Sequence, residues 1–175
     1  MGDEIPRVLL LGNPLLRKIS DEVNEFNSSS QQNDFATLHN VLLRFREEHG
    51  FGRGIAAPQL GMLKRVVALN LNGQQTTMVN PQIIWSSPEE FSLWDDCMCF
   101  PDLLVRVKRK SSISLKFQNP DGSFATWEKL DPARSELLQH ELDHLDGVLA
   151  IDRAIDKESV SYRVNVQATD PQSGN

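Results

Sequence analysis

Residues 131–147 read DPARSELLQHELDHLDG and predict a helix whose two ends are both marked. Asp131 is a favourable N-cap, Pro132 suits the first helical position, and Gly147 suits the turn that ends a helix. Within this stretch, His140-Glu141-Leu142-Asp143-His144 places two histidines one turn apart, where both can bind one metal ion. We therefore expect the fold and the functional site to be built around this helix.

Helix geometry places the candidate metal ligands on the apolar side. At about 100° per residue, the two histidines and the glutamate fall beside two leucines. The first side holds Leu137, His140, Glu141, His144 and Leu145, and the opposite side holds Glu136, Gln139, Asp143 and Asp146. Because burying two imidazoles and a carboxylate is costly without a partner, a bound divalent metal is favoured over a solvated pair of histidines.

Two histidines leave a catalytic metal one protein ligand short, since such sites use three ligands and an open position. The extended metallopeptidase pattern fails at its last histidine, where this chain has Ala150. Glu158 lies in a weakly helical segment and is a poor candidate. A thiolate from Cys97 or Cys99 remains. If residues 94–100 are extended, the two thiols point to opposite faces and only one can reach the metal.

A second helix and a set of short strands account for most of the remaining chain. Apolar residues at spacings of three and four, after Asn33 or Asp34 as N-cap, predict a helix that ends at Gly50. Short apolar runs separated by Gly, Pro, Asn and Asp predict strands, and antiparallel pairing is expected because no helix lies between them. The predicted strands are 65–71, 76–79, 83–86, 103–107, 112–118 and 123–129, with a hairpin turn over 119–122.

Length and composition favour one ordinary globular domain. The chain has 175 residues, of which 39% are hydrophobic and 24% charged, and its formal net charge is −6. This charge disfavours direct binding to nucleic acid, and apolar runs such as 66–69 are far too short to span a membrane. The first seven residues carry two acidic side chains, Asp3 and Glu4, where a signal peptide would carry basic ones, and no long apolar segment follows, which predicts a cytoplasmic protein.

Three motifs, found in the expected order, resemble those of the peptide deformylase family. They are Gly52-Arg53-Gly54-Ile55-Ala56-Ala57-Pro58-Gln59, Asp95-Asp96-Cys97-Met98-Cys99, and Gln139-His140-Glu141-Leu142-Asp143-His144. Weaker matches lie at 13–17, 79–81 and 143–149, and the resemblance extends from about residue 7 to residue 155. It implies an α+β fold in which antiparallel sheets surround a central metal-binding helix.

The resemblance also implies metal ligands and a reaction. Cys97 joins His140 and His144 as the third ligand, while Cys99 stands where the family commonly has serine. The family uses one divalent metal ion, Fe²⁺ first and Zn²⁺, Ni²⁺ or Co²⁺ as substitutes. It removes the formyl group from the N-terminal formylmethionine of nascent polypeptides and releases formate. Glu141 takes a proton from water and returns it to the leaving amine.

Three further residues receive roles from the resemblance. The side-chain amide of Gln59 and the backbone N–H of Met98 face the negative charge that grows on the formyl oxygen. Gly54 lets the backbone approach the substrate closely. We expect residues 1–163 to form a single domain of this kind and residues 164–175 to form a disordered tail. The family's longer members dock on the ribosome through a basic C-terminal helix; we expect this chain to stop short of such a helix, which leaves ribosome docking open.

The chain departs from the family pattern at two positions near the substrate. Asp96 replaces a glycine, and Arg53 replaces an aliphatic residue beside the pocket for methionine. Because an isolated buried charge is costlier than a pair, we predict that Arg53 and Asp96 form an ion pair. These changes leave two alternatives, a deformylase-like protein with altered substrate or a non-catalytic peptide-binding role. The helix motif alone would also permit a metallopeptidase.

A basic run, Arg106-Val107-Lys108-Arg109-Lys110, alternates with the period of a strand. Charged residues on strands most often protect a solvated edge. We therefore interpret this run as an exposed sheet edge and not as a surface that binds nucleic acid.

Overall fold

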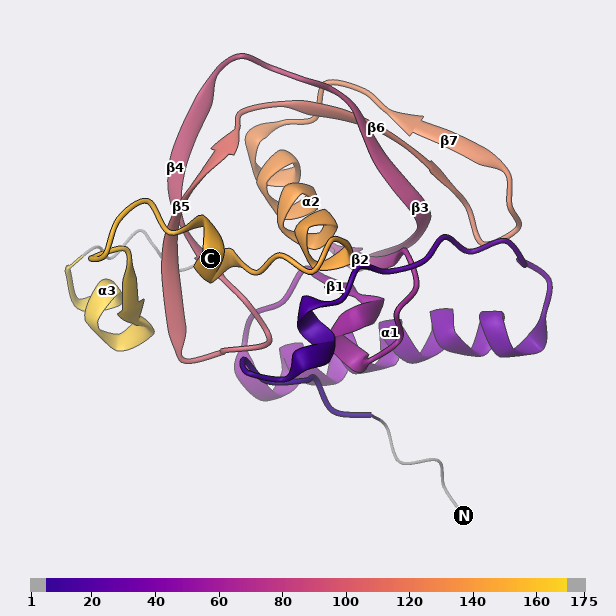
Figure 1. Ribbon diagram of the computed structural model, residues 1–175, viewed down its shortest axis with the longest axis horizontal. Helices are drawn as coiled ribbons and strands as arrows, with labels where there is room; N and C mark the ends of the chain where they lie inside the picture. The colour runs from indigo at the N-terminus through magenta and orange to yellow at the C-terminus, as the bar shows by residue number, and fades with distance from the viewer. Residues whose placement is uncertain (1–5, 170–175) are drawn as a thin grey trace.

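The computed structural model describes residues 6–169, which form two sheets and a central helix (Figure 1). The helices are α1 (Ser29–His49), α2 (Pro132–Leu145) and α3 (Arg163–Thr169), with short 3-10 helices η1 (Pro14–Arg17), η2 (Ala57–Leu60) and η3 (Ala150–Arg153). The strands are β1 (Gly54–Ala56), β2 (Val66–Leu71), β3 (Gln74–Ser86), β4 (Glu90–Asp96), β5 (Leu103–Lys110), β6 (Ile113–Gln118), β7 (Phe124–Trp127) and β8 (Val160–Tyr162).

The two sheets enclose α2. Five strands pair in the order β1-β2-β3-β6-β7, and three pair in the order β4-β5-β8. All of these pairings are antiparallel, as predicted. Figure 1 shows α2 between β4 and β5 on one side and the five-stranded sheet on the other. The predicted α+β fold with a central helix is confirmed.

Helices α1 and α2 cover opposite faces of the five-stranded sheet. Successive residues of a strand point to opposite faces, and β2 uses both of its faces. Val66 and Ala68 pack in the cluster built on α1, while Val67 and Leu69 pack in the cluster built on α2. All four are fully buried. Strand β2 is therefore apolar on both faces, and α2 packs against the inner one.

The ends of α2 lie where the sequence predicted them. Asp131 accepts a hydrogen bond from the backbone N–H of Arg134 at 3.0 Å, and Pro132 is the first helical residue. Gly147, just beyond the helix, has a φ of +72°. A side chain at this glycine would also meet the backbone oxygen of Arg17 at 2.6 Å, so both conformation and space require glycine.

Helix α1 begins earlier than predicted. Ser28, and neither Asn33 nor Asp34, is the N-cap, since its hydroxyl accepts a hydrogen bond from the Gln31 N–H at 3.2 Å. The polar residues that follow Ser28 can be helical because this cap gives a backbone N–H of the first turn a hydrogen-bond acceptor. The predicted end at Gly50 is confirmed. Within residues 6–169, neither this helix nor any other is both long and apolar enough to cross a bilayer.

The strands predicted at 76–79 and 83–86 are one bent strand, β3. Its pairing with β6 shifts register near Pro81, which has no N–H to donate to the ladder. Asn80 adopts a φ of +50°, and its side chain bonds both the N–H and the C=O of Val23 at 2.8 Å. The prediction of two strands was wrong because a bulge accommodates the proline without ending the strand.

The assignment of residues 164–175 to a disordered tail was wrong for residues 164–169, which lie in α3. The remaining residues, 170–175, lie outside the described part of the chain. The start of α3 is held by Arg163, whose backbone N–H donates to the C=O of Asp102 at 2.8 Å. Helix α3 thus continues directly from the short strand β8.

Candidate metal and catalytic site

Helix α2 presents two histidines to the interior, one turn apart. The Nε2 atoms of His140 and His144 lie 3.2 Å from each other, and both side chains are buried. The prediction that the motif faces the core is confirmed. Two buried imidazole nitrogens this close suit joint binding of one cation.

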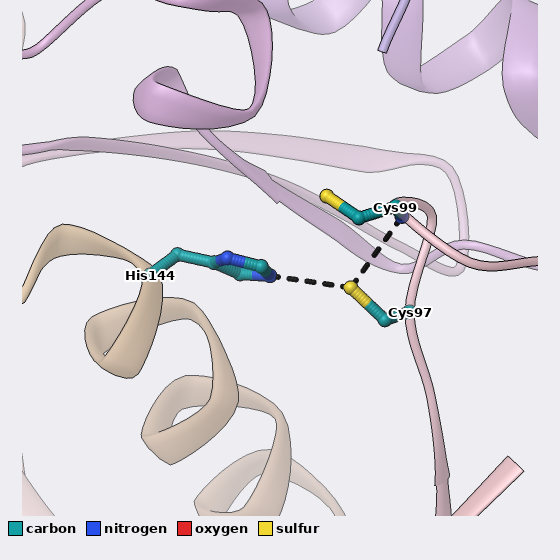
Figure 2. A group of neighbouring side chains, drawn as sticks. All are labelled: Cys97, Cys99 and His144. Atoms are coloured by element: carbon teal, nitrogen blue, oxygen red, sulfur yellow. Dashed lines mark hydrogen bonds between the residues drawn. The ribbon is translucent and has the colours of Figure 1, made fainter. Parts of the chain in front are cut away.

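A turn after β4 brings both cysteines to these histidines. Strand β4 ends at Asp96, and the Phe100 N–H donates back to the Cys97 C=O at 3.1 Å. The Cys97 Sγ lies 3.4 Å from the His144 Nε2 (Figure 2). The two thiols would point to opposite faces only if residues 94–100 were extended, and this condition is not met because the segment turns after Asp96. Both thiols therefore lie near His144.

The convergent atoms form a donor set that fits a transition metal. Ligand atoms of Cys97, Cys99 and His144 all lie within 4.8 Å of one another, and His140 adds a second imidazole. Thiolate and imidazole are the ligands that zinc and iron sites use. Burial raises the pKa of the Cys97 thiol well above its usual range, so a nearby cation is needed to stabilise the thiolate. Cys99 is thus a fourth nearby donor.

His140 is oriented by a buried charge network. Asp95 accepts a hydrogen bond from the His140 Nδ1 at 2.9 Å, which leaves Nε2 free to face the thiols. Arg109 then bonds Asp95 at 3.0 Å and Asp143 at 2.6 Å. Burial favours the neutral imidazole, but the charge of Asp95 outweighs it and raises the pKa of His140 to about 9.

Arg109 corrects our interpretation of the basic run as a solvated edge. Arg106 and Lys108 are exposed, but Arg109 is only 4% exposed. Val105, Val107 and Arg109 alternate along β5 and all point inward. This alternation was visible in the sequence, but it could not show that Asp95 and Asp143 lie in the interior as partners of Arg109.

Glu141 lies beside the histidines, buried and incompletely bonded. Among the described residues, no group bonds its Oε2 atom. A β-carbon added at Gly54 would come within 2.7 Å of the Glu141 Oε1, so this glycine is required by a close approach. Burial raises the pKa of Glu141 to about 7, which places proton exchange by this carboxyl near neutral pH.

Gln59 is held with its amide nitrogen directed at the cysteines. Its Oε1 accepts from the Ala56 N–H at 2.8 Å, and its Nε2 donates to the Cys99 Sγ at 3.5 Å. The first bond fixes which end of the amide faces the site. Met98 lies between the two cysteines in the same turn.

The sequence-predicted residues meet at one cavity of about 480 Å³. His144 does not itself line the cavity, but its Nε2 contacts the Sγ of Cys97, which does. The residues that line the cavity include Arg53, Gly54, Gln59, Asp96, Cys97, Met98, His140 and Glu141. The structure thus brings together all nine candidate site residues from three separate segments.

The predicted ion pair between Arg53 and Asp96 is wrong. Arg53 instead pairs with Glu136 on α2, and Asp96 pairs with Arg163 at 3.4 Å. We had placed Glu136 on the polar side of its helix, but it is buried because α2 is enclosed on several sides. Arg53 and Asp96 therefore each pair with a residue that lies outside the three motifs.

Comparisons with known proteins identify the family. A sequence model described as polypeptide deformylase matches residues 5–160. A peptide deformylase of Thermotoga neapolitana is 33% identical over 147 residues, which cover 84% of this chain and 85% of that protein. The crystal structure of peptide deformylase from Thermotoga maritima, at 30% identity, superposes with a TM-score of 0.79 and covers 87% of this chain and 99% of that chain. This chain therefore belongs to the polypeptide deformylase family.

Proposed function

We propose that this chain removes the formyl group from the N-terminal formylmethionine of new polypeptides with the residues gathered at the cavity. As a member of its family it is a metal-dependent hydrolase that acts on formylated nascent peptides. The observation that supports the assignment of residues is the convergence of two imidazoles, a thiol and the incompletely bonded Glu141 in one cavity. The family match favours this function over a metallopeptidase.

Cys97, His140 and His144 would hold the metal ion. When bound, the ion supplies Lewis acidity, which lowers the pKa of water and polarises the formyl carbonyl. Fe²⁺ is our proposed ion, with Zn²⁺, Ni²⁺ or Co²⁺ as substitutes, because one thiolate and two imidazoles suit several first-row metals. Asp95 would keep the His140 ring in the orientation that binding needs, through its bond to Nδ1.

Glu141 moves the proton. Its Oε2 accepts a proton as the water oxygen adds to the formyl carbon, and the carboxyl then delivers that proton to the amine nitrogen as the C–N bond breaks. This step gives formic acid and a free amino terminus; the acid then ionises to formate and its proton is taken up by the amine, so atoms and charge balance. The Gln59 amide and the Met98 backbone N–H would donate to the formyl oxygen, where negative charge grows.

Formate release tests the proposal directly. The protein is prepared without oxygen, loaded with Fe²⁺ and given a formyl-Met tripeptide, beside a sample treated with a chelator. We expect formate from the loaded sample and none from the chelated one. Tight peptide binding without formate, at full metal occupancy, would identify a non-catalytic binding protein. Cleavage of an unblocked peptide without formate would identify a metallopeptidase.

Gly54→Ala is expected to lower kcat/KM by about 10²-fold, because displacing a catalytic group by about 1 Å has effects of that size. The new β-carbon would meet the Glu141 Oε1 at 2.7 Å and the Leu69 side chain at 3.0 Å. Steady-state formate release measures this loss, and a melting curve checks that the variant folds. Unchanged kinetics would show that β1 and α2 separate easily and that glycine is not needed here.

The two cysteines are expected to differ as ligands. In the Co²⁺-loaded protein, a sulfur-to-cobalt charge-transfer band reports thiolate ligation. Cys97→Ser should lose this band, whereas Cys99→Ser should keep it. The opposite result would assign the ligand to Cys99, whose Sγ lies in the same cluster.

A cytoplasmic site of action and the absence of direct nucleic-acid binding follow from this proposal. New polypeptides emerge from ribosomes in the cytoplasm, and the net charge of −6 opposes binding to phosphate backbones. Any docking on the ribosome would have to use a local surface against this overall repulsion. Fractionation and a binding assay with purified ribosomes test both points.

A further inference from the structure

The wall of the cavity contains an ion pair, Arg53–Glu136, whose members are close in sequence to the proposed site residues Gly54 and His140. Arg53 directly precedes Gly54, and Glu136 lies one helical turn before His140. The Arg53 Nη2 donates to a Glu136 carboxylate oxygen, and its Nη1 donates to the Ala133 C=O at 3.2 Å. Both members of the pair line the same cavity as Glu141.

The pair is asymmetric in its exposure. The Glu136 side chain is only 7% exposed, whereas that of Arg53 is 40% exposed. The buried Glu136 carboxylate therefore binds the Arg53 guanidinium from the interior side and fixes its orientation. A guanidinium has more N–H donors than these two bonds use, so Arg53 has donors left for a ligand. Asp96, which also lines the cavity, is bonded by Arg163, and its charge reaches Arg53 only over a longer distance.

Stability alone does not account for this arrangement. An ion pair in which one partner is as exposed as Arg53 usually contributes little to stability. An aliphatic or thioether side chain that enters here would strip water from Arg53 without returning a hydrogen bond, which is unfavourable. A side chain with an acceptor oxygen near its end would replace the lost water. This part of the cavity wall therefore favours a polar side chain on the first residue of the substrate.

Methionine has one close derivative with such an acceptor. Oxidation of its sulfur gives methionine sulfoxide, which keeps the length of the side chain and adds a polar oxygen. We propose that Arg53, oriented by Glu136, makes this cavity a pocket for substrates that begin with N-formylmethionine sulfoxide. The inference rests on the proposed deformylase function and names the side chain that this particular chain favours.

The test compares three formyl tripeptides that differ only in the first residue, which is methionine sulfoxide, methionine or norleucine. With the metal-loaded protein, kcat/KM for one sulfoxide epimer should exceed that for norleucine by about tenfold, the effect of one charge-assisted hydrogen bond. The double variant Arg53→Ile with Glu136→Ile should reverse this preference. Arg134→Ile, which removes a charge on the same helix outside the cavity, should leave the ratio unchanged.

A binding measurement separates this inference from the proposed function. Glu141→Gln, loaded with Zn²⁺, is titrated with the same three peptides, each carrying a fluorescent label, so that affinity is read without turnover. Tighter binding of the sulfoxide supports the inference even if no peptide releases formate. Equal or tighter binding of norleucine overturns it, even if all three peptides are deformylated. Because this comparison uses one protein, it stands whether or not the double variant folds.

Discussion

Glu141→Gln is expected to reduce formate release by about 10³-fold, the typical contribution of a positioned general acid and base. Glutamine keeps the shape of the side chain but cannot accept the proton of the attacking water. The carboxylate is buried beside Gly54, and its Oε2 atom has no bonding partner among residues 6–169, so this oxygen is free to accept the proton. The measurement is single-turnover formate release, together with the metal content of each sample.

Glu158→Gln is the matched control for this result. Glu158 is exposed, does not line the cavity and was a rejected candidate for the third ligand. The control should keep both metal and activity. If Glu141→Gln released formate at the rate of the control, proton transfer would have to be assigned to another group. If it lost metal instead, Glu141 would be a ligand.

Arg109→Met is expected to lower the free energy of unfolding by about 3–5 kcal/mol, the usual effect of removing one partner of a buried ion pair. Arg109 is 4% exposed and bonds Asp95 and Asp143. Methionine has a similar length, so the loss would come mainly from Asp95, which is buried and would keep only its bond to His140, whereas Asp143 also pairs with Arg153. Urea unfolding of the metal-free protein measures the change.

Arg106→Met provides the comparison on the same strand. Arg106 is exposed, and substitutions at such positions usually change stability by less than about 0.5 kcal/mol. Equal losses in the two variants would mean that the buried network contributes nothing beyond strand formation. A small loss for both would show that Asp95 and Asp143 find other partners when Arg109 is absent.

Local chemistry explains which parts of this fold were predictable. Helix α2 carries its cap, its first proline, its terminal glycine and its metal motif in one continuous stretch, so the sequence alone located it. Strands β1 and β8 have three residues each and exist only because of their partners. A periodicity cannot appear in so few residues, and both were missed.

The charged residues of the site show a second limit of prediction. The motifs indicated Cys97, His140 and Glu141, but the partners of Arg53 and Asp96 lie 83 and 67 residues away in the sequence. No local pattern encodes such a pairing, because it depends on how α2 and α3 approach the cavity. The turn at residues 97–99, which brings both thiols together, was also missed. A segment of three residues is too short for the sequence to distinguish a turn from an extended strand.

The candidate ligands Cys97 and His144 are 47 residues apart in the sequence and belong to different structural units, the turn after β4 and the central helix. A metal ion bound to both therefore crosslinks the three-stranded sheet to the rest of the molecule. Ligands that bind only the folded state add stability that grows with the logarithm of their free concentration. We therefore expect the lifetime of this protein in a cell to depend on metal supply, so that metal scarcity would remove the protein itself as well as its activity.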